Sequence, residues 1–265
     1  MRKAKYLFFD IECSNGYNIC SFGYCIVNEK MKIIEKKDIV INPESTFVLG
    51  QKGKRAKIEL AYPEEYFYKQ DTFPSFYGKI KKLLSQSGYK VIGHSIQSDI
   101  YFLAFACRRY HLQSIKIDGY DTQKIYKEYS KSSQVASLER ILTALEIDLD
   151  NLTLHKSSDD AHATFLVLRE LCYLENKSLD ELLSSYEGCK VNGNIIISNV
   201  NTQKKYIGLF KLKKVSKNSW QYLFYDVYSI VQVERFAKAY RDVAQSVRAP
   251  PCTPSEANAN NRRLF

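Results

Sequence analysis

The sequence predicts an α/β protein with a mixed five-stranded sheet flanked by helices. The first indication is the apolar run Tyr6–Phe9, which is typical of a buried central strand. Next, Ile19–Val27 and Met31–Ile41 are rich in aromatic and β-branched residues, and the turn Asn28-Glu29-Lys30 joins them into an antiparallel meander. From residue 73 onward, helical periodicity alternates with short apolar segments. This order implies a sheet covered by helices.

The helices follow from their apolar spacing. In Phe73–Ser87, for example, Phe76, Ile80 and Leu84 share one face. The remaining two strands are expected at Lys90–Gly93 and Ile115–Tyr120. Further helices are expected at Ile96–Tyr110, Thr122–Tyr129, Ser137–Leu145, Ser157–Glu175 and Leu179–Tyr186.

The connection between Glu44 and Thr72 is long, and the sequence does not define its structure. It contains a basic cluster followed by an aromatic cluster. Long loops that combine charged and aromatic residues more often have a function than not. A solvated surface loop is the simpler interpretation for any single lysine in it. The clusters are Lys52, Lys54, Arg55 and Lys57, then Tyr62, Tyr66, Phe67 and Tyr68.

The composition changes after Gly188, which suggests three parts: a main domain at 1–187, a small accessory region at 188–243 and a tail at 244–265. In the accessory region, short strands are expected at 195–197, 206–212 and 220–227, with a closing helix at 231–243. Turn residues at Asn192-Gly193-Asn194 and Lys217-Asn218-Ser219 favour hairpins, giving a small α+β appendage. The tail has no periodicity, and we expect it to be disordered.

The chain of 265 residues carries a net charge of +10, which makes an anionic partner plausible, although solubility alone could explain it. Its seven cysteines are odd in number and include no CxxC pair, which argues against a disulfide framework and a zinc site and for a reducing compartment. The apolar run near the N-terminus is too short for a signal peptide, and no stretch approaches the length of a membrane span. We therefore expect a cytoplasmic protein with no membrane partner.

Asp10 and Glu12 end the first strand. Strand side chains alternate, so the two carboxylates point to the same face. Two neighbouring carboxylates at the end of a buried strand repel each other, and a divalent cation such as Mg²⁺ relieves that repulsion. The simpler alternative is a solvated strand end with two unrelated acids. More acids that converge on the same point would favour the metal site.

Asp99 lies in the first turn of the predicted helix after Gly93. Leu103 and Ala106 share its helical face, so this acid lies on the stripe that faces the core and needs a partner there. A capping acid at a helix N-terminus is the alternative, because the helix dipole favours negative charge in the first turn.

The long helix at residue 157 begins Ser157-Ser158-Asp159-Asp160. Asp160 shares its face with Val167 and Leu171, which makes it the better inward-facing candidate, and Asp159 is the better cap. His155 precedes this helix in a loop. A neutral histidine beside a metal cluster could take a proton from a water, although a lone histidine in a loop is usually surface.

In this order, these segments resemble the DEDDh family of 3′→5′ exonucleases, whose fold is ribonuclease H-like. Phe9-Asp10-Ile11-Glu12 is similar to the first motif, and Gly93-His94-Ser95-Ile96-Gln97-Ser98-Asp99 to the second. The third motif is matched by His155, four intervening residues, and Asp160-Ala161. The resemblance runs from about residue 5 to residue 174, and the region after Gly188 lies outside it.

The sequence departs from the family pattern at three places. Ser95 stands where the second motif usually has Asn, Ser98 where a bulky apolar residue usually precedes the Asp, and Cys13 where Thr usually follows the first motif. The aromatic cluster replaces the family's usual short helix-starting signature after Pro43. None of these changes removes a metal ligand or the base, but together they leave the substrate preference open.

The resemblance implies two Mg²⁺ or Mn²⁺ ions held by Asp10, Glu12, Asp99 and Asp160, with His155 as the base. It also implies substrate contacts near Ile11, Cys13 and His94, and a nucleic acid with a free 3′ end as the partner, either DNA or RNA. The expected reaction is stepwise release of 5′-mononucleotides. The alternatives are a catalytically silent nucleic-acid-binding module of the same fold and a nuclease that cuts internally. Residues 188–243 could contact the substrate or a protein partner.

Overall fold

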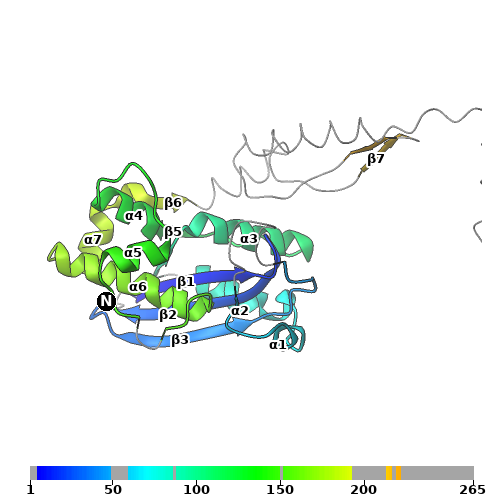
Figure 1. Cartoon of the computed structure of the whole chain (residues 1–265), viewed down its shortest axis with the longest axis horizontal. Helices are drawn as coiled ribbons and strands as arrows, with labels where there is room; N and C mark the ends of the chain where they lie inside the picture. Colours follow the sequence, from blue (N-terminus) through cyan, green and yellow to red (C-terminus); the bar gives the residue numbers. More distant parts are fainter. Residues whose placement is uncertain are drawn as a thin grey trace, which may run out of the picture. The chain divides into compact units, whose positions relative to one another are not determined.

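The computed structural model describes residues 5–48, 59–85, 88–149 and 152–192, and two short strands at 213–216 and 219–221. Six strands form one sheet in the order β3-β2-β1-β4-β5-β6 (Figure 1). The two pairings among β1, β2 and β3 are antiparallel, β1–β4 and β4–β5 are parallel, and β5–β6 is antiparallel. The strands are β1 Lys5–Cys13, β2 Ile19–Asn28, β3 Ile33–Val40, β4 Tyr89–Gly93, β5 Asp118–Asp121 and β6 Lys190–Asn192.

The predicted mixed sheet is confirmed, and the five predicted strands are all present. A sixth strand, β6, extends the sheet beyond residue 187 by pairing with β5. It has three residues, which is too short for an alternating pattern to reveal it in the sequence.

The helices predicted between residues 73 and 186 are present, with boundaries that agree to within two residues. One short helix, α1, lies in the connection that the sequence left undefined. A helix of five residues is too short to show a 3.6-residue period. The helices are α1 Glu64–Tyr68, α2 Phe73–Ser85, α3 Ile96–Arg109, α4 Thr122–Tyr129, α5 Leu138–Ala144, α6 Ser157–Leu174 and α7 Leu179–Ser185, followed by one 3₁₀ turn at Glu187–Cys189.

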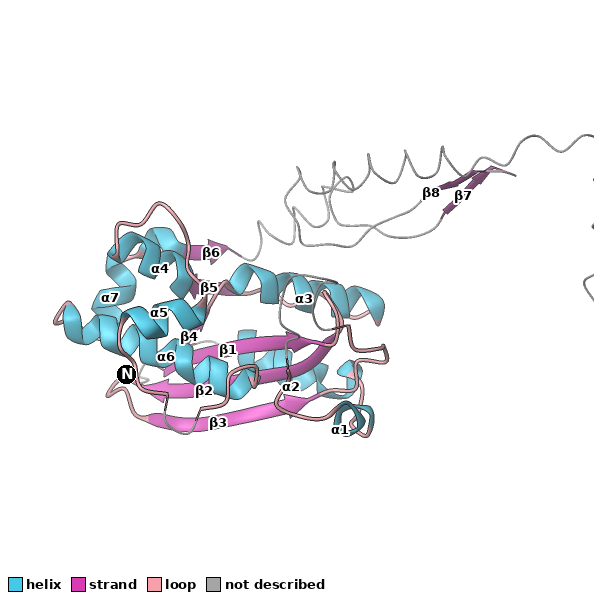
Figure 2. Ribbon diagram, in the orientation of Figure 1, coloured by secondary structure: helices cyan, strands magenta, loops and turns pink. Residues whose placement is uncertain are grey.

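The helices cover both faces of the sheet and form two apolar clusters. On one face, Leu7 and Phe9 pack with residues of α2 and α3. On the other, Tyr6 and Phe8 pack with residues of α4 to α7, and Figure 2 shows α6 lying along β1 and β2. This alternation along β1 places Asp10 and Glu12 on the same face as Tyr6 and Phe8, the face that α6 covers.

Beyond β6, little of the accessory region is described. The strands β7 Lys213–Ser216 and β8 Ser219–Gln221 pair antiparallel. Of the turn predicted at 217–219, only Ser219, the first residue of β8, is described. The strands predicted at 195–197 and 206–212, most of the one at 220–227, the hairpin turn at 192–194, the closing helix at 231–243 and the tail at 244–265 lie outside the described residues. The chain divides into two compact units at Ile207/Gly208, and the three-part division made from the sequence stays a prediction. Among the described helices, none is long and apolar enough to cross a lipid bilayer.

Candidate active site

The end of β1 carries the first two acids of the candidate site. Asp10 pairs in register with Gly23 of β2, and Glu12 pairs with Ser21. Burial raises the pKa of Asp10 well above its usual value, and the negative charges of Asp99, Glu12 and Asp160 raise it further. The carboxyl groups predicted from three separate segments are therefore close enough in the folded chain to affect the ionisation of Asp10.

Asp99 reaches this cluster because the N-terminus of α3 lies close against the sheet. The side chain of Ile96, the first residue of α3, packs against Gly119 of β5, where an added side-chain carbon would lie 2.6 Å from Ile96 Cδ1. Asp99 is only 4% exposed, and its Oδ2 has no hydrogen-bond partner among the described residues. Burial raises its pKa, and the charges of Glu12 and Asp121 add to that effect.

The N-terminus of α6 also lies directly on the sheet, at Gly23. A side-chain carbon on Gly23 would lie 2.0 Å from the backbone of Ser157 and Ser158. Asp38 of β3 holds this first turn, because its Oδ1 accepts a hydrogen bond from the Ser157 hydroxyl at 2.8 Å and from the Ser158 backbone N–H at 3.0 Å. Asp38 thus supplies the cap that Lys156, at the N-cap position, does not provide.

Asp160, in that first turn, faces the acids of β1. Burial and then the charge of Glu12 raise the pKa of Asp160 to about 7. One oxygen each from Glu12 and Asp160 and a ring nitrogen of His155 lie within 4.8 Å of one another, a spacing that could hold a metal ion.

His155 is fixed by its backbone. Its φ of 62° is in the left-handed region, and its N–H donates to Asp160 Oδ2 at 3.0 Å. Its Nδ1 lies 3.6 Å from Glu12 Oε1, and the Glu12 carboxylate raises the pKa of the imidazole. The ring therefore lies beside the acids and is partly open to solvent, as a proton acceptor would need to be.

Asp159 has a different environment from its neighbour Asp160. Its Oδ1 lies 2.5 Å from Lys36 Nζ, and its Oδ2 accepts a hydrogen bond from the Thr153 N–H at 3.1 Å. The lysine and this hydrogen bond lower the pKa of Asp159 below its usual value, despite burial. Asp159 thus anchors the entry to α6, as a capping acid would.

The three residues predicted to contact the substrate lie in different environments. Ile11 is buried in the core between β1 and the α2–α3 face, whereas Cys13 is half-buried at the end of β1. His94 Nδ1 lies 3.0 Å from Thr122 Oγ1 at the start of α4, and burial lowers the pKa of His94 to about 4. His94 therefore contacts a neighbouring helix in this structure, and its role toward a substrate stays a prediction, as do those of Ile11 and Cys13.

Sequence reasoning missed two acids that position this site. Asp38 caps α6 from β3, and Asp121 accepts hydrogen bonds from the Ser95 and Gln123 N–H groups, each at 3.0 Å. The Asp121 contact holds Ser95, which precedes α3 in a left-handed conformation with φ 54°. In the sequence, Asp38 lies within a predicted strand and Asp121 directly follows one. Such a position does not reveal which residue the acid contacts.

The chemistry of the cluster is suited to a divalent cation. Three of its acids, Asp10, Asp99 and Asp160, have raised pKa values because burial and mutual repulsion disfavour their charged forms. Carboxylate oxygens are the ligands that Mg²⁺ and Mn²⁺ prefer, and the unpartnered Asp99 Oδ2 is one such oxygen. A bound cation would offset the repulsion that the protein alone leaves in place.

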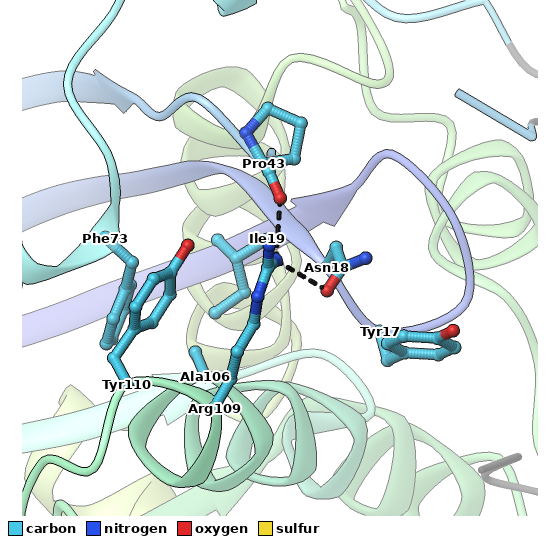
Figure 3. A pocket seen from close by; sticks show the side chains of 8 residues that line it. All are labelled: Tyr17, Asn18, Ile19, Pro43, Phe73, Ala106, Arg109 and Tyr110. Carbon is cyan, nitrogen blue, oxygen red and sulfur yellow. Dashed lines mark hydrogen bonds between the residues drawn. The ribbon is translucent and has the colours of Figure 1, made fainter. Parts of the chain in front are cut away.

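A small pocket lies beside the loop between β1 and β2, and Arg109 of α3 reaches across it (Figure 3). The guanidinium donates to Asn18 Oδ1 at 3.0 Å and to the Pro43 carbonyl at 2.7 Å. The first of these bonds ties α3 to the loop that follows Cys13, and the second ties α3 to the segment after β3. Its lining is Tyr17, Asn18, Ile19, Pro43, Phe73, Ala106, Arg109 and Tyr110.

The sheet order, with helices on both faces, is the ribonuclease H-like fold that solved DEDDh exonucleases share. The model of the family described as "DNA polymerase III subunit epsilon-like, C-terminal domain" matches residues 25–171. Because the match covers more than half of the chain, the protein belongs to this DEDDh family. The matched segment contains Asp99, His155 and Asp160 and begins after Asp10 and Glu12. No curated protein matches the sequence.

Solved structures share the fold at low sequence identity. The nuclease domain of 3′hExo, a DEDDh family member bound to rAMP, has 18% identity and a TM-score of 0.52 over 66% of this chain and 94% of that domain. A 3′-exonuclease that recognises the 3′ end of a histone mRNA stem-loop has 16% identity and a TM-score of 0.52, over 66% of this chain and 65% of the other. Exonuclease I has 14% identity and a TM-score of 0.53, over 69% and 43%. The similarity thus spans less than two thirds of the latter two proteins.

Proposed function

We propose that this protein is a metal-dependent 3′→5′ exonuclease that releases 5′-mononucleotides from nucleic-acid 3′ ends. The observation that carries the proposal is the convergence of acids from three segments. Asp10 and Glu12 come from β1, Asp99 from α3 and Asp160 from α6, and the charges of Asp99, Glu12 and Asp160 all raise the pKa of Asp10. His155 lies at the edge of the same cluster, 3.6 Å from Glu12.

The four carboxylates would hold two Mg²⁺ or Mn²⁺ ions. When bound, such ions supply the positive charge that activates a water and stabilises the leaving 3′ oxygen. His155 accepts the proton of the attacking water, and its backbone bond to Asp160 holds the ring beside the acids while it does so. Water attack on the terminal phosphorus breaks the bond to the 3′ oxygen and releases one 5′-mononucleotide.

The test is digestion of matched 5′-labelled single-stranded DNA, single-stranded RNA and 3′-overhang duplexes, with Mg²⁺ and then with EDTA. Stepwise shortening of the labelled strands, lost in EDTA, is expected, and the released 5′-mononucleotides carry no label. His155→Ala should lower kcat by about 10²- to 10⁴-fold, whereas the exposed His111→Ala should not. Internal fragments would indicate an endonuclease, and binding without digestion would indicate a silent binding module.

The same experiment decides between DNA and RNA, which the site geometry leaves open. The expectation of a cytoplasmic location rests on cysteine usage, and all six cysteines in the described part of the chain are free thiols. Contact of residues 188–243 with the substrate is a separate expectation, supported by their lysines.

A further inference from the structure

Two tyrosines in the connection between β3 and α2 form a stacked pair. The rings of Tyr62 and Tyr66 have centroids 5.1 Å apart and planes inclined by 25°. Tyr62 is half-buried, whereas Tyr66 lies on the solvent side and is 43% exposed. An exposed ring stacked on a second ring is a rigid flat surface, to which we refer as the Tyr62–Tyr66 pair.

The Tyr62–Tyr66 pair adjoins the candidate active site through two hydrogen bonds. The N–H of Ala61 donates to the carbonyl of His155 at 3.3 Å. The Tyr62 hydroxyl donates to Asp38 Oδ2 at 2.9 Å, and Asp38 also caps the first turn of α6. The segment before the pair thus contacts the proposed base, and the pair itself contacts the residue that positions Asp160.

Neighbouring rings hold the pair in place. Phe67 is buried, with 1% exposure, and its ring meets Tyr62 edge-on at 5.9 Å. Phe47, earlier in the same connection, packs against Phe67 with ring centroids 5.2 Å apart. The Tyr66 ring is therefore supported before any ligand arrives, and a preorganised surface loses little entropy on binding.

We propose that Tyr66 stacks against an unpaired base of the strand whose 3′ end occupies the active site. The inference rests on the proposed function and names its substrate class: nucleic acid that is single-stranded near its 3′ end, as DNA or RNA. Aromatic rings bind bases of any sequence because every base has a flat π-face. The basic run at residues 52–57 precedes the pair in the same connection, and the chain carries a net charge of +10, which suits a polyanion.

Inside a duplex, neighbouring base pairs cover both faces of a base, so an internal base must leave the helix to stack on Tyr66. We therefore expect single-stranded DNA or RNA and long 3′ overhangs to be digested faster than blunt duplexes of the same sequence. The base in question lies upstream of the terminal nucleotide, because the terminal phosphodiester must reach the acids.

The decisive experiment combines a Tyr66→Ala variant with oligonucleotides that lack one base. Single abasic residues are placed in turn at the second, third and fourth positions from the 3′ end, in a DNA series and an RNA series. On intact strands, Tyr66→Ala should lower kcat/KM by about 5- to 150-fold. On the strand that lacks the stacked base, the wild type should lose the same factor, and the substitution should cost nothing further.

Matched variants separate stacking from folding. Tyr66→Trp should keep kcat/KM near the wild-type value, because it preserves a π-face. Tyr173→Ala removes another tyrosine, 81% exposed near the C-terminal end of α6 and about 20 Å along the helix from Asp160, and should have no effect. An equal loss for Tyr66→Ala on every strand, intact or abasic, would overturn the proposal, as would no loss on any.

A binding measurement keeps this test independent of the proposed function. Fluorescence anisotropy in EDTA, with 5′-fluorescein oligo-dT and oligo-U, reports binding without digestion. If the wild type digests nothing in Mg²⁺, the proposed exonuclease function fails, and binding weakened severalfold by Tyr66→Ala but not by Tyr173→Ala would still support the stacking site. Equal binding by both variants and the wild type would overturn it.

Discussion

At the residue scale, two adjacent aspartates of α6 have opposite electrostatic environments. The pKa of Asp160 is raised to about 7 by burial and by Glu12, whereas the pKa of Asp159 is lowered by Lys36 and the Thr153 N–H. The charge of Asp160 thus costs stability in the metal-free protein, and the charge of Asp159 contributes stability. Their helical positions differ by one residue, and this rotation decides which of them faces the acids.

We expect Asp160→Asn and Asp159→Asn to have opposite effects. At pH 8 in EDTA, Asp160→Asn should raise the melting temperature, because it removes a repelled charge, and should lower Mg²⁺-dependent digestion more than about 100-fold. Asp159→Asn should lower the melting temperature, because Lys36 loses its charged partner, and should keep most of the activity. The measurements are thermal unfolding and digestion of a labelled strand. Full activity in the Asp160 variant but not in the Asp159 variant would contradict this assignment of the third motif.

The raised pKa of Asp160 also predicts how stability depends on pH. Between about pH 4 and pH 7 the folded protein keeps a proton on Asp160 that the unfolded chain has released. In EDTA, stability should therefore fall as pH rises through this window. A cation that binds the charged carboxylates should reverse the loss, so Mn²⁺ should raise the melting temperature by roughly 2–4 °C or more at pH 8 and much less at pH 5.

Thermal unfolding at both pH values, with EDTA or with Mn²⁺, checks this prediction. Asp160→Asn is the control, because it removes one of the titrating groups and should reduce the pH dependence in EDTA. A Mn²⁺ effect that is the same at pH 5 and pH 8 would argue against a site made of these carboxylates.

At the scale of elements, the site depends on how closely two helix N-termini approach the sheet. The start of α6 lies on Gly23, where a side-chain carbon would lie 2.0 Å from the Ser157 backbone. Asp38 then fixes this turn through the Ser157 hydroxyl and the Ser158 N–H. Since Asp160 and the backbone bond to His155 belong to the same turn, a displacement of α6 moves both groups relative to Glu12.

Gly23→Ala should therefore lower both activity and stability, because the Ser157 backbone cannot yield as a flexible side chain would. We expect a loss of about 1–3 kcal/mol in the free energy of unfolding, typical of overpacking, and at least a tenfold loss of activity. Gly78→Ala is the matched control. It lies inside α2 with nothing within 4 Å of the new carbon, and should raise stability by about 0.5–1 kcal/mol without affecting digestion. Denaturant unfolding and digestion rates of the two variants test this prediction.

At the scale of the whole molecule, part of the net charge of +10 comes from lysines in the sequence after β6. The segment after β6 contributes six lysines within fourteen residues: Lys204, Lys205, Lys211, Lys213, Lys214 and Lys217. Lysines that contact phosphates release counterions, so binding weakens steeply with salt. Because β6 belongs to the main sheet, a deletion that tests these lysines should begin after Asn192 and not at residue 188.

We expect a chain that ends at Asn192 to bind oligo-dT with a shallower salt dependence than the full chain. The slope of log K against log salt should decrease by about 0.7 for each phosphate that the shortened chain no longer neutralises. Replacing the six lysines by glutamine in the full chain is the control, and should reproduce the change without a truncation. Anisotropy titrations at several salt concentrations measure the slope, and an unchanged slope in both variants would assign these lysines to another partner.

Much of this protein could be predicted from the sequence, because the relevant signals are local. The alternation along β1 placed Asp10 and Glu12 on one face, and helical spacing oriented Asp99 and Asp160. The strands and helices of the main domain were predicted for the same reason, since strand alternation and helical spacing each show within one segment. The short elements β6 and α1 were missed because neither is long enough to display a period.

The tertiary structure alone decided what depends on residues far apart in the chain. Asp38 caps a turn 120 positions later, and Ala61, which precedes the Tyr62–Tyr66 pair, contacts His155 in a way that no local pattern encodes. Side-chain periodicity fixes the direction of a residue within its own element, whereas its partner is set by how the elements pack. The sequence by itself therefore determined the face of its own element on which each acid lies, and only the fold decided what holds the acids and what lies beside them.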